Sequence, residues 1–229
     1  VGFHVTTPSP WALQSFIRRA LRSLRQFSRS AGSAKAPRAS RYLVLEVTSH
    51  ALDQYRVWGI DFEIGVLTNV THEHLDYHKT YENYVMTKMK LLQKSKVSVI
   101  NKDDASYKLI SNIKNEISKI HSKNKKWVTY GIKNNADINP KNFPFKTSLI
   151  GDFNKYNVLA AVAACRELGI SDQIIREAIL TFKPPMGREE IVYPSTSSGQ
   201  VNFKVMVDFA HTPNAFEEIL SSIKPSIKG

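Results

Sequence analysis

The sequence predicts an α/β fold built on a mostly parallel sheet. Short apolar runs of the kind that form buried strands alternate with longer segments whose apolar residues recur at helical spacing. The chain has 229 residues, of which 42% are hydrophobic and 23% charged, as in ordinary globular proteins. A chain of this length can bury the core of one or two domains.

The first predicted elements are a helix and a strand. Residues 7–10 (TPSP) form a helix-start signal. The apolar spacing that follows predicts a helix over 11–26. The Ser-, Ala- and Gly-rich segment 28–40 predicts a loop or an insertion. The apolar run 42–47 is typical of a buried parallel strand that ends at polar residues.

The same alternation continues through the middle of the chain. We expect a strand at 64–67, which ends in the polar cluster 68–78, and then a helix at 81–93. The next expected elements are a strand at 97–100, an amphipathic helix at 104–120 with lysines on its outer face, and a strand at 127–130. Residues 134–150 are expected to form an antiparallel excursion.

The last third of the chain predicts a change of domain. An Ala-rich helix at 157–168 and a second helix at 171–182 precede Pro184-Pro185, and a new strand is expected at 204–208. We therefore expect one domain over residues 1–185 and the beginning of another over 186–229.

The net charge of +12 raises the question of nucleic-acid binding. The basic residues concentrate in 1–41 and 79–133, whereas residues 42–78 carry six acids against one arginine, a net charge of −5. A locally acidic, His-rich segment suits a bound cation and argues against a continuous basic face, so we expect no nucleic-acid partner. The sequence has no apolar stretch of about 20 residues, which predicts a cytoplasmic protein without a membrane span.

Side chains of the kinds that can bind cations lie at the ends of the first two expected strands. They are Glu46, His50, His72, His74, Asp76 and His78. Several of them should converge on one crevice, because parallel strands end at one edge of a sheet. Spacing alone favours solvated or hydrogen-bonded histidines over ligands, and no zinc signature is present. The single cysteine, Cys165, lies in a small-residue helical run, which favours a buried structural thiol over a nucleophile.

Six motifs in order resemble those of the Mur ligases of the MurE type. Residues 46–56 (EVTSHALDQYR) resemble EVSSHAL-x-Q-x-R, residues 68–78 (TNVTHEHLDYH) resemble TN-L-x-x-DHLDYH, and residues 84–92 resemble Y-x-A-A-K-x-x-L. Residues 151–157 (GDFNKYN), 185–188 (PMGR) and 207–214 (VDFAHTPN) resemble G-x-F-N-x-x-N, P-x-GR and VDYAHTPD. The resemblance covers most of the chain.

The resemblance implies a three-layer α/β central domain, followed by the start of a Rossmann-like C-terminal domain. It implies an ATP- and Mg²⁺-dependent ligase of peptidoglycan precursor synthesis. Such an enzyme adds the third amino acid, diaminopimelate or lysine, to UDP-MurNAc-L-Ala-D-Glu through an acyl phosphate. It also implies a cytoplasmic enzyme, which we expect to be a monomer.

The resemblance also assigns site residues. Glu46 and His74 would bind Mg²⁺, and Lys88 would be carbamylated near that metal. Asn157, Arg188, Asp208 and His211 would contact the nucleotide, with His211 and Lys88 taking part in catalysis. The UDP-muramoyl peptide would be bound by Thr6, Thr7, Thr48, Gln54 and Arg56.

Structural roles compete with several of these assignments. Lys88 suits a solvated helix lysine, Thr7 a helix cap, Arg56 a surface salt bridge and Asn157 an N-cap, a role that could coexist with nucleotide binding.

The chain also departs from the family. It contains no GxxxxGK(S/T) loop, so we expect it to begin after that loop and to be inactive alone. Thr48, His72, Glu73, Glu189 and Glu190 are smaller departures, together with the 28–41 insertion and the Ser-rich 195–199. The alternatives are a related amide ligase, such as a cyanophycin or folylpolyglutamate synthetase, a basic nucleic-acid-binding module, and an inactive remnant.

Overall fold

The computed structural model describes residues 8–30, 42–120, 125–193 and 205–224. The chain divides into two compact units, one of residues 1–63 and 74–95 and the other of residues 64–73 and 96–229. The domain boundary expected after residue 185 stays a prediction. Thr6, Thr7, the Ser-rich segment 195–199 and residues 31–41 of the expected insertion lie outside the described residues.

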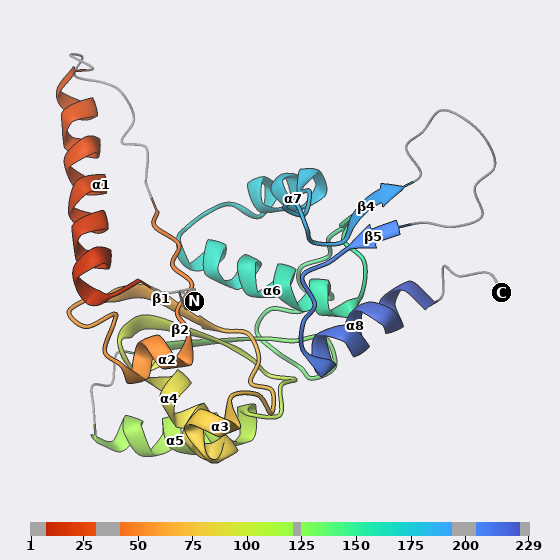
Figure 1. Ribbon diagram of the computed structural model, residues 1–229, viewed down its shortest axis with the longest axis horizontal. Coiled ribbons are helices and arrows are strands. Elements are labelled where there is room, and N and C mark those ends of the chain that lie inside the picture. Colours follow the sequence, from red (N-terminus) through yellow and green to blue (C-terminus); the bar gives the residue numbers. More distant parts are fainter. Residues whose placement is uncertain (1–7, 31–41, 121–124, 194–204, 225–229) are drawn as a thin grey trace. The chain divides into compact units, whose positions relative to one another are not determined.

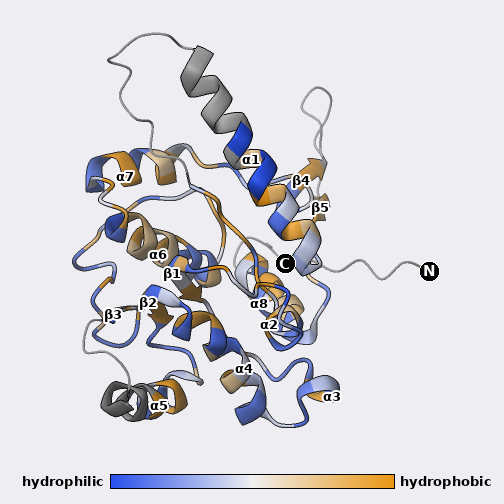
Figure 2. Ribbon diagram, turned by 90° about the vertical axis from the view of Figure 1, so that its left-hand side faces the viewer, coloured by the Kyte–Doolittle hydropathy of each residue, from blue (hydrophilic) through white to orange (hydrophobic). Residues whose placement is uncertain are grey.

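The first unit contains four helices within its described residues. They are α1 (Pro10–Ser30), α2 (Ser49–Asp53), α3 (Leu75–His78) and α4 (Tyr81–Gln93). Helix α1 begins where Ser9 Oγ accepts a hydrogen bond from the Ala12 N–H, at 3.3 Å. It continues four residues beyond the expected end at 26. Figure 2 shows an apolar start of α1 followed by a hydrophilic segment, as the arginines after Ile17 require.

A small apolar cluster holds this unit together. Leu13 of α1, Leu52 of α2 and Val57 are buried, and Leu45 and Val47 pack against them. The strand expected at 42–47 is wrong, because these residues form no strand in the structure. Val44 is 93% exposed. Alternate side chains of this apolar run therefore cover the cluster. The run is not buried on both faces, as a central parallel strand would be.

The second unit is built on a three-stranded sheet. Its strands are β1 (Phe62–Leu67), β2 (Ser95–Asn101) and β3 (Lys126–Tyr130), in the order β1-β2-β3. Strands β2 and β3 are parallel and pair from Val97 with Lys126 to Asn101 with Tyr130. The strands expected at 64–67, 97–100 and 127–130 are thus confirmed, and so is the mixed α/β class with a parallel sheet.

Helices lie on both sides of this sheet. In Figure 1, α6 (Asp152–Glu167) lies above the strands and α5 (Tyr107–Ile120) below them. The apolar side of α6, with Leu159, Val162 and Ala163 fully buried, packs on Val99 and Tyr130 of the sheet. Helix α7 (Asp172–Thr181) packs against α6 and contributes the buried Ile175. Three layers of this kind agree with the expected architecture.

The segment after β3 differs from the expectation. Residues 134–150 form no antiparallel excursion, since their only bridge among the described residues is an isolated parallel one between Tyr130 and Ile138. Two backbone hydrogen bonds make it, from the Ile138 N–H to Thr129 O and from the Gly131 N–H to Ile138 O, at 3.0 and 3.1 Å. The segment beyond it is held by Asn139, whose side chain bonds the backbone of its own turn.

The last described elements are a strand pair and a helix. Strand β4 (Glu190–Tyr193) pairs antiparallel with β5 (Val205–Val207), which confirms the strand expected at 204–208. Helix α8 (Pro213–Ile223) follows, and Thr212 caps it by accepting a hydrogen bond from the Ala215 N–H at 3.3 Å. No helix among the described residues is long and apolar enough to cross a membrane.

Candidate functional site

Two helix caps place the polar residues of the first unit. Thr48 accepts a hydrogen bond from the Ala51 N–H at 3.2 Å and begins α2, so that His50 projects from the first turn. Thr80 accepts one from the Asn83 N–H at 3.1 Å and begins α4. Helix α4 packs against both α2 and α3, and ring contacts of His50 place the HLDYH segment beside α2. The hydroxyl groups of Thr48 and Thr80 therefore fix where α2 and α4 begin, and so fix the placement of the polar residues on them.

Three of the histidines expected to converge do so. The ring of His50 lies 5.3 Å from that of His74 and 5.6 Å from that of His78, measured between centroids. Tyr77 lies 4.2 Å from His50, and Tyr84 stacks on His78 at 4.9 Å. Residues from α2, α3 and α4 thus form one aromatic cluster. Its edges can hydrogen-bond or coordinate through imidazole nitrogens.

The environment keeps two of these imidazoles neutral near pH 7. Burial lowers the pKa of His50, and the neighbouring His74 lowers it further. Burial also lowers the pKa of His78, with His50 adding to the effect. The Nε2 atom of His78 lies 2.9 Å from Ser49 Oγ. A neutral imidazole can accept a proton or coordinate a metal ion, and a lowered pKa favours that form at each of these two rings.

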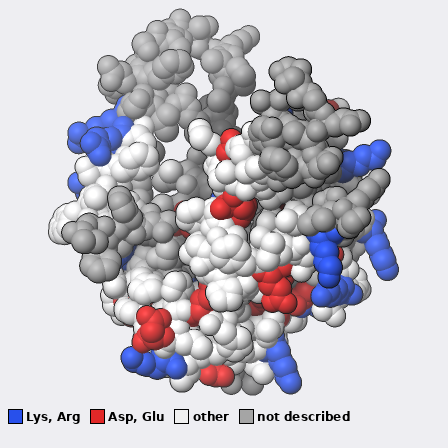
Figure 3. All heavy atoms as spheres, turned by 45° about the vertical axis from the view of Figure 1, so that its right-hand side comes forward, with Lys and Arg blue, Asp and Glu red and all other residues white. Residues whose placement is uncertain are grey.

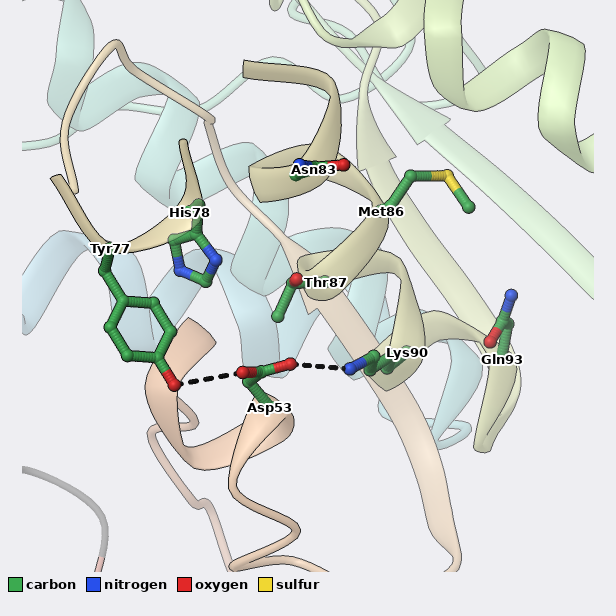
Figure 4. Close-up of a pocket in the computed structure, with 8 residues that line it drawn as sticks. All are labelled: Asp53, Tyr77, His78, Asn83, Met86, Thr87, Lys90 and Gln93. Atoms are coloured by element: carbon green, nitrogen blue, oxygen red, sulfur yellow. Dashed lines mark hydrogen bonds and ion pairs between the residues drawn. The ribbon is translucent and has the colours of Figure 1, made fainter. Parts of the chain in front are cut away.

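A pocket of about 440 Å³ opens beside this cluster, as Figure 4 shows. Its wall carries Asp53, whose carboxylate accepts hydrogen bonds from Tyr77 Oη at 3.0 Å and from Lys90 Nζ at 2.9 Å. The bond from Lys90 and then the bond from Tyr77 lower the pKa of Asp53. Neither Asp53 nor Lys90 was singled out from the sequence, because their partners lie 24 and 37 positions apart along the chain.

The remaining expected residues of this unit lie on α4 or in the segments that flank α2. Glu46 is exposed and precedes α2, and Gln54 accepts a hydrogen bond from Arg56. The surface salt bridge considered for Arg56 stays a prediction. Lys88 is half-buried on α4, with its Nζ 5.0 Å from the centroid of the Tyr84 ring. Among the residues that the structure describes, no three His, Cys, Asp or Glu side chains gather as a metal-binding group. The Mg²⁺ role of Glu46 and His74 stays a prediction.

The second unit contains a larger cavity of about 890 Å³. It lies among the ends of the strands, the start of α6 and the segments that flank β4 and β5. All four residues expected to contact a nucleotide line it: Asn157, Arg188, Asp208 and His211. Asn157 lies within α6 and is not its N-cap, since that helix begins after Gly151. The structure therefore brings together residues that are separated by up to 54 positions in sequence.

A partly buried carboxylate organises the wall of this cavity. Asp103, just after β2, accepts hydrogen bonds from the backbone N–H groups of Ile132, Lys133 and Asn134, at 2.6 to 2.8 Å, and from Tyr156 Oη at 2.9 Å. Burial alone would raise the pKa of Asp103, but these donors together lower it to about 2. Asp103 thus ties the end of β2 to the loop after β3 and to α6.

Asp208 and its neighbours form the opposite wall. Asp208 accepts a hydrogen bond from the Glu189 N–H at 2.9 Å, and the Glu189 carboxylate accepts bonds from the Ile150 N–H and from Asn154 Nδ2. The guanidinium of Arg188 lies 4.9 Å from the centroid of the Phe209 ring. The Nδ1 atom of His211 lies 2.9 Å from Phe209 O.

This arrangement presents a cation, an aromatic face and hydrogen-bonding groups to one cavity, and such a set can hold an anionic ligand with a planar group. Sequence reasoning treated Glu189 only as a departure and missed its role.

Cys165 agrees with the structural interpretation. It lies on α6, half-buried against the core of the second unit, and burial raises the pKa of its thiol. A thiol that stays protonated is a poor nucleophile.

Comparison with known proteins gives consistent matches. A family model described as the Mur ligase middle domain matches residues 4–165. The chain is 36% identical over 206 residues to the UDP-N-acetylmuramoyl-L-alanyl-D-glutamate--2,6-diaminopimelate ligase 1 of Clostridium acetobutylicum, covering 82% of this chain and 40% of the relative. It is 37% identical over 209 residues to the corresponding ligase of Aquifex aeolicus, covering 83% and 40%. The chain therefore spans about 40% of the length of these curated relatives.

A solved structure of a UDP-N-acetylmuramoyl-L-alanyl-D-glutamate--2,6-diaminopimelate ligase superposes with a TM-score of 0.61 at 31% identity. The superposition covers 79% of this chain and 39% of that one.

Proposed function

Because the chain belongs to the Mur ligase family, we propose that it is part of an ATP-dependent ligase that joins the third amino acid to UDP-MurNAc-L-Ala-D-Glu. The observation that carries this proposal is the identity of 36 to 37% to ligases of that name over more than four fifths of the chain. In such a reaction a substrate carboxylate oxygen attacks the γ-phosphorus of ATP and ADP leaves. The amine of the incoming amino acid then attacks the acyl carbon, and phosphate and a proton leave.

The cavity of the second unit supports the nucleotide part of the proposal. Its volume of about 890 Å³ is in the range of small-molecule sites. We assign nucleotide binding to Asn157, Arg188 and Asp208. His211 lines the same cavity and would act on the transferred group. The guanidinium of Arg188 suits a phosphate oxygen, and the ring of Phe209 beside it suits a base or ribose face.

The first unit would supply the metal and acyl-substrate contacts. Mg²⁺ is commonly held by one or two protein side chains together with phosphate oxygens and waters, so the carboxylate of Glu46 and the imidazole of His74 are a suitable donor set. When bound, the ion neutralises charge on the phosphoryl oxygens. We assign Lys88 as the carbamylated lysine near it.

Thr6, Thr7, Thr48, Gln54 and Arg56 are proposed contacts of the UDP-linked peptide. Arg56 forms the anionic anchor.

Two alternatives receive less support. A cyanophycin or folylpolyglutamate synthetase shares the reaction type, but the curated relatives at this identity carry the muramoyl-dipeptide ligase name. A nucleic-acid-binding module would need a continuous basic surface. On the face drawn in Figure 3, Asp and Glu side chains of the described residues lie over the middle, and Lys and Arg side chains lie toward the edges.

The proposal is tested with the full-length enzyme. UDP-MurNAc-L-Ala-D-Glu, ATP and Mg²⁺ are incubated with either diaminopimelate or lysine, and products are identified by mass. We expect ADP and phosphate in amounts equal to the tripeptide product, with one of the two amino acids. The proposal would be contradicted if no tripeptide formed with either amino acid and the enzyme bound duplex oligonucleotide tightly at physiological salt. The cytoplasmic location and the monomeric state stay predictions.

A further inference from the structure

One carboxylate joins three helices in the first unit. Asp53 is the last residue of α2, Tyr77 belongs to α3 and Lys90 to α4. The Tyr77 hydroxyl donates to Oδ2 of Asp53 at 3.0 Å, and the Lys90 ammonium donates to Oδ1 at 2.9 Å. Figure 4 shows the two partners on opposite sides of the carboxylate. Each oxygen is thus used by a different helix.

Residues of the proposed reaction lie on or just before each of these helices. Thr48 directly precedes α2 and Glu46 lies three positions before it, His74 is the residue before α3, and Lys88 lies two positions before Lys90 on α4. The connections are short and bonded, since the Tyr77 N–H donates to His74 O at 3.2 Å. Tyr77 and Lys90 are therefore connected to His74 and Lys88 through short stretches of hydrogen-bonded or helical backbone.

We propose that Asp53 is a positioning residue, which holds α3 and α4 at a fixed placement on α2 so that His74 and Lys88 face the metal site together with Glu46. This inference rests on the function proposed above. Asp53 need not touch the metal or the substrate, because it acts through Tyr77 and Lys90.

A purely stabilising role is a weaker explanation. The side chains of Lys90 and Asp53 are 37% and 40% exposed, and exposed ion pairs contribute at most about 1 kcal/mol to folding. The helices already pack through Leu52 of α2 and through Val85, Met89 and Leu92 of α4, all of which are buried. Apolar contacts therefore hold the unit together. The polar clamp, which consists of Asp53, Tyr77 and Lys90, fixes the placement of the three helices on one another.

The pair lies at positions that the shared motifs leave open. Asp53 falls on the first open position of EVSSHAL-x-Q-x-R, and Lys90 falls on an open position of Y-x-A-A-K-x-x-L. The motif residues on either side supply the chemistry. The clamp is the means by which this sequence aligns them.

The test compares Asp53→Ala with the full-length wild-type enzyme and uses Mn²⁺ in place of Mg²⁺. Free Mn²⁺ measured by electron paramagnetic resonance, with nucleotide present, reports metal affinity without turnover. We expect Asp53→Ala to weaken Mn²⁺ binding by about tenfold, as the loss of outer contacts of a metal site does. It should raise the Mg²⁺ concentration for half-maximal activity by a similar factor and leave the KM for ATP within about twofold. Asp53→Glu, which keeps a carboxylate, should recover part of the affinity.

A matched control separates positioning from stability. Asp172→Ala breaks the ion pair of Asp172 with Arg166 between α6 and α7, in the second unit, and should leave the affinity for Mn²⁺ unchanged. If Asp53→Ala binds Mn²⁺ within twofold of wild type, the positioning role is refuted. If Asp53→Ala does not fold, Tyr77→Phe removes one of the two bonds and decides the question by the same measurement. A wild-type enzyme that ligates nothing would instead refute the proposed function, before any variant is made.

Discussion

Replacing Asp103 by asparagine tests the carboxylate that organises the wall of the larger cavity. The change keeps the size of the side chain and removes the charge that accepts three backbone N–H bonds and the Tyr156 hydroxyl. The pKa of Asp103 falls from 3.8 to about 2 in the folded protein. That difference corresponds to about 2.5 kcal/mol at pH 7, and screening at this partly exposed group reduces it to about 1–2 kcal/mol.

The predicted loss depends on pH in a definite direction. Because the folded pKa lies below the unfolded one, the carboxylate stabilises the fold fully above about pH 4, and this contribution disappears as the pH falls toward 2. Wild type and Asp103→Asn should therefore differ most at neutral pH and converge on acidification. Urea unfolding between pH 3 and 7, followed by tryptophan fluorescence, to which Trp127 in β3 contributes, measures the difference.

Asp152→Asn serves as the control. Asp152 pairs with Lys155 on the surface at 2.7 Å, and its carboxylate side chain is 77% exposed, so its loss should leave the free energy of unfolding unchanged within error. The reasoning is refuted if Asp103→Asn unfolds within about 0.5 kcal/mol of wild type at pH 7. It is equally refuted if the difference between the two proteins persists in full at pH 3.

Three further outcomes follow from the site. Glu46→Gln in the full-length enzyme should remove most ligase activity at saturating Mg²⁺ and leave circular dichroism unchanged, whereas activity within a few-fold of wild type would exclude it as a ligand. Lys88 should carry a carbamate in the nucleotide-bound enzyme, visible as density beyond its amine. Lys88→Ala should lose activity while keeping its Tm. An unmodified Lys88 that points to solvent in an active enzyme would show that it is an ordinary solvated lysine. The 229-residue chain alone should release no phosphate from ATP above a Glu46→Ala control, because its sequence contains no phosphate-binding loop.

Local signals predicted the helices with strong caps. Helix α4 begins and ends as expected, at residues 81 and 93, because Thr80 provides a hydroxyl cap that can be recognised from the sequence. The start of α6 was placed five residues late, since Gly151, with φ +85°, precedes it without a side-chain cap. A Cβ at Gly151 would also lie 2.6 Å from an atom of the Phe153 ring. The glycine is therefore needed there, but it gives no helix signal.

Long-range contacts explain the remaining differences. Residues 42–47 form no strand with another described segment, and apolar composition carries no information about which segment a strand would pair with. Strand β4 was missed because it is four residues long and because its partner among the described residues is β5, which follows a sequence segment of mostly polar and small residues. The donors to Asp103 lie 29 to 53 positions along the chain, so no local pattern could indicate them. Resemblance to a family did place Asn157, Arg188, Asp208 and His211, which line one cavity.

The backbone at His74 has a consequence for how its side chain can be studied. His74 adopts φ 58° and ψ 23°, a left-handed conformation that glycine adopts without strain and alanine does not. An alanine variant would remove the imidazole and strain the turn before α3 at the same time. Glycine removes the imidazole and keeps the turn, and asparagine keeps the turn with a shorter polar group. A pair of variants, glycine and asparagine, can therefore separate what the ring does from what the chain bend requires.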